Sequence, residues 1–406
     1  MKCGLLGEKL GHSYSPQIHA ELADYEYRLY EKAPDEVEDF VRNGDWHGLN
    51  VTIPYKKIVI PFCDELSETA ATIGSVNTLL RRDDGSIYGD NTDAFGFETL
   101  LTQTIPDSIA GQKALVLGTG GASVTVCAVL KKHGAEVVTI SRSGENNYQD
   151  LDRHADAKLL VNTTPVGMYP KNGQCPVELW HFPKLQGVLD AVYNPARTAL
   201  LLQAEKLGIP HAGGLTMLVA QARRSSEIFL GNKLPDQEIP RVTKLLSDSM
   251  QNIILIGMPG CGKSTVGAIL SQCLKRPLLE ADAELVKAAG VPIPTIFETE
   301  GEAGFRRRET AILAQLGKQS GTVISTGGGC VTRPENYSLL HQNGTIIWLR
   351  RDLDKLAREG RPLSMNADLH AMYAVREPLY TRFADYTVDN YGTPEETADA
   401  VMEVLR

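Results

Sequence analysis

The sequence predicts an α/β protein built from open parallel sheets, and three observations carry this prediction. Two short apolar runs, at residues 113–117 and 252–256, are each followed by a glycine-rich loop and then by an amphipathic helix pattern. A strand, a glycine loop and a helix in this order are typical of the first unit of a doubly wound sheet. The third observation is the length of 406 residues, which at roughly 150 residues per domain predicts two or three domains.

Composition and charge narrow the class of protein. Hydrophobic residues make up 42% and charged residues 22%, as in ordinary globular proteins, which excludes a disordered, collagenous or coiled-coil chain. Lys and Arg number 41 against 50 Asp and Glu. A net charge of −9 argues against sequence-independent binding of nucleic acid, which requires a cationic footprint. Local cationic pockets for small anions remain compatible with this charge.

No targeting or membrane segment is visible. No apolar run approaches the roughly 18 residues of a membrane helix, and the first seven residues reach Glu8 too soon for a secretory segment. The seven cysteines are scattered and contain no C-x-x-C pair, which indicates reduced thiols rather than a disulfide framework or a zinc site. We therefore expect a cytoplasmic protein without a membrane partner.

A domain boundary is expected near Met250. Residues 230–240 contain structure-breaking Gly, Pro and Asn, residues 242–250 read as a short helix, and the second strand and glycine loop follow at once. No Gly/Ser-rich or Pro-rich spacer separates them, so the tether is short. The two glycine loops differ in spacing and are not duplicates, so the two halves are interpreted separately.

Four polar clusters precede the first glycine loop, at residues 12–16, 50–56, 75–78 and 90–93. Each follows or interrupts a strand-like run, where α/β domains place binding residues. Singly, each also has a structural explanation: the Ser-x-Ser-Pro segment as a helix N-cap, Asn-x-Thr as a turn and Lys56 as a solvated side chain. Only the combination favours a binding site.

These clusters, together with residues 213–222, occur in the order of the signature segments of the shikimate dehydrogenase family, and the resemblance covers residues 1–249. It implies reduction of 3-dehydroshikimate to shikimate. It also implies a substrate domain over residues 1–96 and 214–249 around a Rossmann NADP domain over residues 97–213. The implied substrate ligands are Ser13 and Ser15 for the carboxylate, Thr52, Asn77, Asp93 and Gln221 for the ring hydroxyls, and Tyr193.

The same resemblance makes Lys56 and Asp93 the catalytic pair. Delivery of a hydride to a ketone creates an alkoxide, which needs a positioned proton donor, and a lysine beside a carboxylate provides one.

The first glycine loop is the predicted dinucleotide site. It departs from G-x-G-x-x-G because Ser123 occupies the last position, so the isolated motif is weak, but its place between a strand and a helix strengthens it. The next strand ends at Ser141 and Arg142 rather than at an acidic residue, which favours NADPH over NADH. A solvated arginine at a strand end is the alternative for Arg142. The predicted cofactor ligands are Gly118, Thr119, Gly120, Gly121, Ala122, Ser141, Arg142 and Gly214.

The second glycine loop, at residues 257–265, matches G-x-x-x-x-G-K-[ST] between a strand and a helix. Its backbone N–H groups are expected to cradle the phosphates of ATP, Lys263 to neutralise the outer phosphates and the Ser264 hydroxyl to ligate Mg²⁺. The predicted nucleotide ligands are Gly257, Gly260, Cys261, Gly262, Lys263, Ser264 and Thr265.

Four later segments lie at residues 280–282, 305–309, 325–329, and 361–363 with 376–380. In this order they resemble shikimate kinase, and the resemblance covers residues 251–406. It implies a P-loop domain similar to the nucleoside-monophosphate kinases, with shikimate as phosphate acceptor. Glu280 stands where that family usually has aspartate, and its role is left open. The implied roles are Asp282 as the residue that orients the acceptor hydroxyl, Arg306 and Arg376 as carboxylate ligands, Gly327, Gly328 and Gly329 as room for the ring, and Arg361 as a lid residue over the phosphates.

Alternatives remain for two of these residues: Asp282 as a helix N-cap and Arg306 as one member of a solvated cationic patch. Guanidinium groups suit a carboxylate, and phosphoryl transfer requires cations around the moving group.

Together the halves predict a bifunctional enzyme that makes shikimate and then phosphorylates it. One alternative is a non-catalytic shikimate-binding sensor. The other is a quinate-oxidising dehydrogenase joined to another small-molecule kinase. For the fusion of the two halves, we favour the explanation that it only fixes the stoichiometry of the two activities. Direct transfer of shikimate between the two sites is the alternative.

Overall fold

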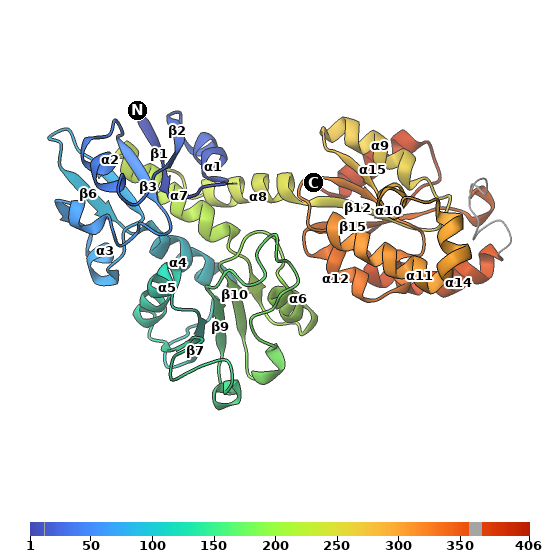
Figure 1. The fold of residues 1–406 in the computed structure, drawn as a ribbon, viewed down its shortest axis with the longest axis horizontal. Coiled ribbons are helices and arrows are strands. Elements are labelled where there is room, and N and C mark those ends of the chain that lie inside the picture. Colours follow the sequence, from blue (N-terminus) through green and yellow to red (C-terminus); the bar gives the residue numbers. More distant parts are fainter. Residues whose placement is uncertain (12, 357–367) are drawn as a thin grey trace. The chain divides into compact units, whose positions relative to one another are not determined.

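The computed structural model describes residues 1–11, 13–356 and 368–406, and its α/β architecture confirms the predicted fold class (Figure 1). The backbone divides into two compact units. The first comprises residues 1–193 and 198–246, and the second comprises residues 194–197 and 247–406. The predicted lid residue Arg361 lies outside the described residues.

The first unit begins with a six-stranded sheet in the order β2-β1-β3-β5-β6-β4. Strands β1, β2 and β3 are parallel, whereas β3–β5 and β5–β6 are antiparallel; the two glycine loops did not predict this mixed sheet. The strands are β1 (Lys2–Gly7), β2 (Glu26–Glu31), β3 (Gly48–Val51), β4 (Glu65–Leu66), β5 (Thr78–Arg81) and β6 (Ile87–Asp90).

Helices from two distant parts of the sequence pack in this region. Ile18 and Leu22 of α1 share one apolar cluster with Val219 of α7 and Leu246 of α8. Helix α8 begins at Glu238, four residues before the predicted start, because Pro at its third position is tolerated in a first helical turn. The helices are α1 (Ser15–Leu22), α2 (Val37–Asn43), α3 (Glu68–Ile73), α7 (Leu215–Leu230) and α8 (Glu238–Met250).

The second sheet of this unit is fully parallel, in the order β11-β10-β9-β7-β8. Strand β7 has the predicted bounds, and α5 follows the glycine loop as predicted. The strands are β7 (Lys113–Leu117), β8 (Glu136–Ile140), β9 (Leu159–Asn162), β10 (Gly187–Asp190) and β11 (His211–Ala212). The helices are α4 (Thr92–Thr104), α5 (Gly121–Lys132) and α6 (Ala199–Lys206).

The second unit contains a parallel sheet in the order β13-β14-β12-β15-β16. Every residue of β12 is buried, as expected for a strand covered by helices on both faces. The strands are β12 (Asn252–Ile256), β13 (Leu278–Glu280), β14 (Val323–Ser325), β15 (Gly344–Arg350) and β16 (Tyr386–Asp389). The helices are α9 (Lys263–Leu274), α10 (Ala281–Ala289), α11 (Ile293–Leu316), α12 (Glu335–His341), α14 (Leu369–Phe383) and α15 (Pro394–Val404).

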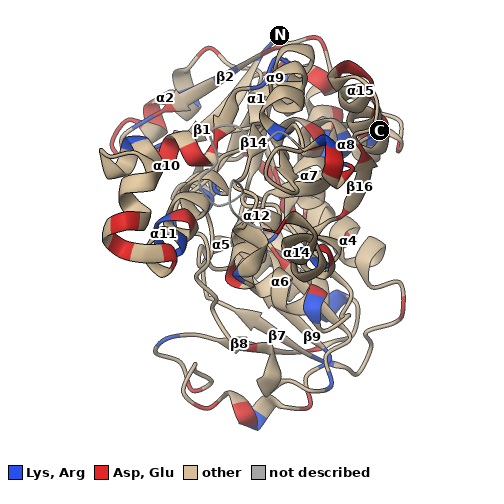
Figure 2. Ribbon diagram, turned by 90° about the vertical axis from the view of Figure 1, so that its right-hand side faces the viewer, with Lys and Arg blue, Asp and Glu red and all other residues tan. Residues whose placement is uncertain are grey.

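Short 3₁₀ turns complete the described segments, at Ile60–Phe62, Leu151–His154, Leu179–His181, Cys330–Thr332 and Leu353–Lys355. Figure 2 shows acidic and basic residues interspersed along the helices and loops. None of the helices in the described segments combines the length and apolar character that crossing a bilayer requires.

Because the carboxyl ends of parallel strands meet at one edge of a sheet, β12, β13 and β14 bring the residues that follow them together. These are the second glycine loop, the start of α10 and the glycine run after Ser325.

Candidate active sites

Lys56 and Asp93 form an ion pair in the first unit. Lys56 lies in the turn after β3, and Asp93 lies in the first turn of α4, whose N-terminus favours a negative charge. Lys56 Nζ is 2.5 Å from Asp93 Oδ2, and the two side chains are only 18% and 12% exposed. The predicted pair is therefore in direct contact, held on two different elements, and the alternative of a freely solvated Lys56 is wrong.

The amide of Asn77 has a fixed orientation beside this pair. Its Oδ1 accepts hydrogen bonds from the Thr92 backbone N–H at 2.6 Å and from the Thr92 and Thr78 hydroxyls at 3.1 Å. A backbone N–H only donates, so Oδ1 must face Thr92 and the Asn77 NH₂ group faces the other way. That NH₂ lies 3.5 Å from Gln221 Oε1, so two predicted hydroxyl ligands meet, one directly before β5 and the other on α7.

The serine segment and Tyr193 also meet. The ring of Tyr193 lies edge-on to Tyr14, with 6.0 Å between centroids, and burial raises the pKa of the Tyr193 phenol. Ser13 Oγ accepts the Ser15 backbone N–H at 3.2 Å, so Ser13 has a local structural role as well. Among the described residues, the Thr52 side chain has no hydrogen bond to the other predicted ligands, although Thr52 lies in the same turn as Lys56.

The first glycine loop contains a hydrogen bond that accounts for its departure from the glycine motif. Ser123 Oγ donates to the Gly118 carbonyl at 2.7 Å, which closes the loop where the motif has a third glycine. Gly118 has φ +102°, and a Cβ there would lie 2.9 Å from Thr164, so only glycine fits. A Cβ on Gly120 or Gly121 would meet nothing within 4 Å, so this face of the loop is open to a ligand.

The residues at the end of β8 leave both interpretations of Arg142 open. Arg142 is exposed, and Ser141 Oγ accepts the Gly144 backbone N–H at 2.8 Å. Gly214, also predicted to contact the cofactor, precedes α7, and a Cβ there would lie 2.2 Å from the Ala191 carbonyl oxygen. Close backbone packing alone therefore accounts for this glycine.

The second glycine loop has the geometry of a phosphate cradle. Gly257, Gly260 and Gly262 all have positive φ values. Lys263 is buried, and its Nζ donates to the carbonyls of Gly257 and Met258 at 3.0 and 3.1 Å. Within the described segments, the backbone N–H groups at the start of α9, from Gly262 to Thr265, donate to no backbone acceptor. Successive unpaired N–H groups at a helix start suit an anion.

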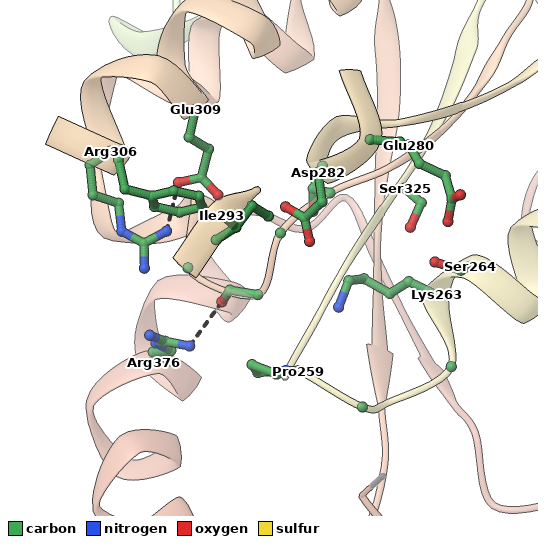
Figure 3. Close-up of a pocket in the computed structure, with 18 of the residues that line it drawn as sticks. Pro259, Lys263, Ser264, Glu280, Asp282, Ile293, Arg306, Glu309, Ser325 and Arg376 are labelled. Carbon is green, nitrogen blue, oxygen red and sulfur yellow. Dashed lines mark hydrogen bonds and ion pairs between the residues drawn. The ribbon is translucent and has the colours of Figure 1, made fainter. Parts of the chain in front are cut away.

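A cavity of about 340 Å³ joins this loop to the predicted acceptor residues. Figure 3 shows the Asp282 carboxylate and the Lys263 amine pointing into it, with Arg306 and Arg376 on the far side. The oxygens of Glu280, Ser325 and Ser264 lie at the Lys263 end. The predicted acceptor and nucleotide residues that line it are Gly260, Gly262, Lys263, Ser264, Thr265, Asp282, Arg306, Gly327, Gly328, Gly329 and Arg376.

Arg306 is buried against a carboxylate that the sequence interpretation left without a role. Its Nη1 is 2.7 Å from Glu309 Oε2, and the two side chains are 8% and 2% exposed. The alternative of a solvated cationic patch is therefore wrong for Arg306. Burial raises the pKa of Glu309, against the lowering effect of Arg306. The sequence could have predicted this pair from its spacing, because residues three apart on a helix are neighbours.

The glycine run leaves room for this pair. A Cβ on Gly329 would lie 2.1 Å from Arg306 Nη2, and a Cβ on Gly327 would lie 2.5 Å from Glu309 Oε1. Arg376 Nη1 donates to the Gly328 carbonyl at 3.3 Å. The N-cap of α10 is Glu280 rather than Asp282, so the capping alternative for Asp282 is wrong.

Comparison with known proteins covers both parts of the chain. The family model of the shikimate dehydrogenase substrate binding domain matches residues 5–79, and that of shikimate kinase matches residues 259–406. The shikimate dehydrogenase (NADP(+)) of Clostridium beijerinckii is 36% identical over 258 residues, which cover 57% of this chain and 94% of that protein.

Solved structures agree with this assignment. A chorismate mutase/shikimate 5-dehydrogenase fusion protein from Clostridium acetobutylicum is 34% identical with a TM-score of 0.57, over 61% of this chain and 97% of that one. A shikimate 5-dehydrogenase from Thermus thermophilus, solved with NADP(H) and shikimate, is 28% identical with a TM-score of 0.55, over 60% of this chain and 99% of that one. The chain therefore belongs to the shikimate dehydrogenase family and carries a shikimate kinase domain over residues 259–406.

Proposed function

We propose that the chain is a bifunctional enzyme of the shikimate pathway. Residues 1–249 reduce 3-dehydroshikimate to shikimate with NADPH, and residues 250–406 transfer phosphate from ATP to shikimate. The observation that carries the proposal is the single cavity in which Lys263 of the phosphate loop faces Asp282, Arg306 and Arg376, because it joins a nucleotide site to a site for a hydroxylated carboxylic acid. The Lys56–Asp93 contact supports the first activity in the same way.

In the reduction, bound NADPH would supply a hydride for the ketone carbon. The carbonyl π electrons then move to oxygen, and the Lys56 ammonium donates the proton that converts this alkoxide into a hydroxyl. Asp93 holds the ammonium in place and stabilises its charge before transfer. Asn77 offers its NH₂ group to a ring oxygen, since its carbonyl oxygen is already occupied.

The preference for NADPH over NADH rests on Arg142 and Ser141. An exposed guanidinium and a hydroxyl at the end of β8 suit a 2′-phosphate, where an NAD-selective site carries an acidic residue. The open face of the loop at Gly120 and Gly121 gives a diphosphate access to the start of α5.

In the phosphorylation, the loop N–H groups and Lys263 hold the phosphates, and Asp282 orients the attacking hydroxyl. Arg306 and Arg376 bind the carboxylate of the acceptor, as guanidinium groups do with bidentate geometry. The oxygen donors at the Lys263 end fit Mg²⁺, a hard cation that prefers oxygen ligands. Ser264 would hold Mg²⁺ there, and the metal would neutralise charge on the transferred group.

For the domain organisation we propose residues 1–96 and 214–249 as the substrate domain and residues 97–213 as the NADP domain. The apolar cluster shared by α1, α7 and α8 supports this division, because it ties the late helices to the early part of the chain.

A paired assay tests the proposal. NADPH oxidation with 3-dehydroshikimate and ADP release with shikimate are measured on the wild type, Lys56→Ala and Lys263→Ala. Each substitution is expected to abolish one activity and spare the other. Tight shikimate binding without turnover in both assays would instead establish a sensor, and faster turnover of quinate or gluconate would establish a different pair of substrates.

A further inference from the structure

Asn390 connects the end of the second unit's sheet to the phosphate loop. It follows β16, is 2% exposed, and its Nδ2 donates to the Cys261 carbonyl at 2.6 Å. Its backbone N–H donates to the Arg350 carbonyl at 2.7 Å, so main chain and side chain are both anchored. The contact therefore joins β16 to a loop that lies 129 residues earlier in the sequence.

Thr397 on α15 fixes the other end of the same amide. Its hydroxyl donates to Asn390 Oδ1 at 2.8 Å and also lies 3.1 Å from the Thr393 carbonyl. Thr397 is 2% exposed. Since a carbonyl only accepts, the Asn390 NH₂ must face Cys261 and its oxygen must face Thr397.

The position of this contact matters for the phosphate cradle. In a trans peptide the C=O and the following N–H point in opposite directions. Anchoring the Cys261 carbonyl on Asn390 therefore aims the Gly262 N–H away from Asn390, toward the open side of the loop. Gly262 itself is left-handed, with φ +99°, and a Cβ there would lie 2.8 Å from Asn390 Nδ2, so the peptide is held close to the amide.

We propose that Asn390, oriented by Thr397, is a positioning residue that aims the Gly262 N–H at the phosphates of the nucleotide. The inference rests on the proposed kinase function of this domain. It assigns a role in nucleotide affinity to two side chains that line no part of the described cavity.

Matched substitutions at Thr397 test it in the full chain. Thr397→Val removes the hydroxyl without changing the size of the side chain, and Thr397→Ser keeps it. We expect Thr397→Val to raise the KM for ATP and the dissociation constant of ADP, measured by calorimetry, about tenfold, the effect of one hydrogen bond. The KM for shikimate and kcat are expected to change less than twofold, and Thr397→Ser is expected to restore the wild-type values.

Asn390→Asp adds a pH signature that a purely structural role lacks. An ionised carboxylate opposes the Cys261 carbonyl, whereas a protonated carboxyl donates to it. ADP affinity in this variant is therefore expected to be weakest at high pH and to recover toward the wild type as the pH falls.

Three outcomes would overturn the inference: equal ADP affinity in the wild type, Thr397→Val and Thr397→Ser; an equal rise of the KM values for ATP and shikimate; or an ADP affinity of Asn390→Asp that follows the wild-type pH profile. ADP binding also separates this inference from the proposed function. A wild type that binds ADP but does not phosphorylate shikimate refutes the function and still allows the positioning role to be measured.

Discussion

The two units hold their key lysines in opposite electrostatic settings. Lys56 touches the carboxylate of Asp93 at 2.5 Å, whereas Lys263 donates to two neutral backbone carbonyls, and no carboxylate pairs with it in the described segments. A lysine that exchanges a proton with its substrate benefits from a fixed counter-ion. A lysine that attracts phosphates keeps its full positive charge available for them.

The largest expected effect, on kcat, follows from removing the ion pair between Lys56 and Asp93. Asp93→Asn keeps the size of the side chain but removes the counter-ion, so proton transfer from Lys56 loses its alignment. We expect kcat for NADPH oxidation to fall on the order of 10²–10⁴-fold while ADP release is unchanged. Asp156→Asn is the matched control, because Lys113 and Asp156 form a more exposed pair at 2.6 Å. An unchanged kcat in Asp93→Asn would remove the catalytic role.

A smaller effect, on the KM for shikimate, is expected at the Arg306–Glu309 ion pair of the second unit. Glu309→Gln removes the buried one of the two carboxylates that pair with Arg306, so the guanidinium proposed to bind the substrate carboxylate is less well oriented. We expect the KM for shikimate to rise roughly 30-fold with the KM for ATP unchanged. Glu302→Gln serves as the control, since Glu302 is 61% exposed and lies 3.3 Å from Arg306. Equal effects of the two substitutions would contradict the special role of Glu309.

Arg142 extends the comparison to the cofactor. Like Lys263, it forms no ion pair in the part of the chain that the structure describes, and it is exposed. Arg142→Ala is expected to raise the KM for NADPH about tenfold, because an exposed charged contact to a phosphate is lost, with little change for NADH. If both KM values rise equally, the side chain is a solvated arginine and not a 2′-phosphate ligand.

The smallest expected effect is on stability and concerns the buried carboxyl group of Asp190. Among the residues that the structure describes, Asp190 accepts hydrogen bonds only from neutral donors, on Asn162, Val192 and Thr198, and burial raises its pKa from 3.8 to about 6. A raised pKa in the folded state means that stability is highest below the unfolded pKa and falls as the pH rises through about 6.

We therefore expect the free energy of unfolding of the wild type to fall on the order of 1 kcal/mol between about pH 4 and pH 6 relative to Asp190→Asn. Urea denaturation of the two proteins at several pH values measures the difference. A difference that stays constant with pH would show that Asp190 does not titrate in this range.

Local signals made much of the fold predictable from the sequence. Strands β7 and β12 have the predicted bounds, since an apolar run ending at a glycine loop needs no distant contact to be recognised. Helix α9 begins at Lys263, three residues before the first apolar position that marked it, because the phosphate loop runs directly into the helix.

The parts of the site that were not predicted depend on distant contacts. The position of Glu309 beside the glycine run depends on the packing of α11 after β14. Asn390 contacts Cys261, which lies 129 residues earlier in the sequence. Ser123 looked like a departure from a motif until its hydrogen bond to Gly118 showed what replaces the missing glycine. Such roles follow from tertiary packing, which a single sequence does not display.

Gly329 lies at the edge of the proposed acceptor site, and only a hydrogen atom fits as its side chain. The guanidinium of Arg306 occupies the volume that a single methyl group would need. Alanine at this position would therefore displace the guanidinium that we propose as a ligand of the substrate carboxylate. A side chain at this position would therefore affect substrate binding more than the fold.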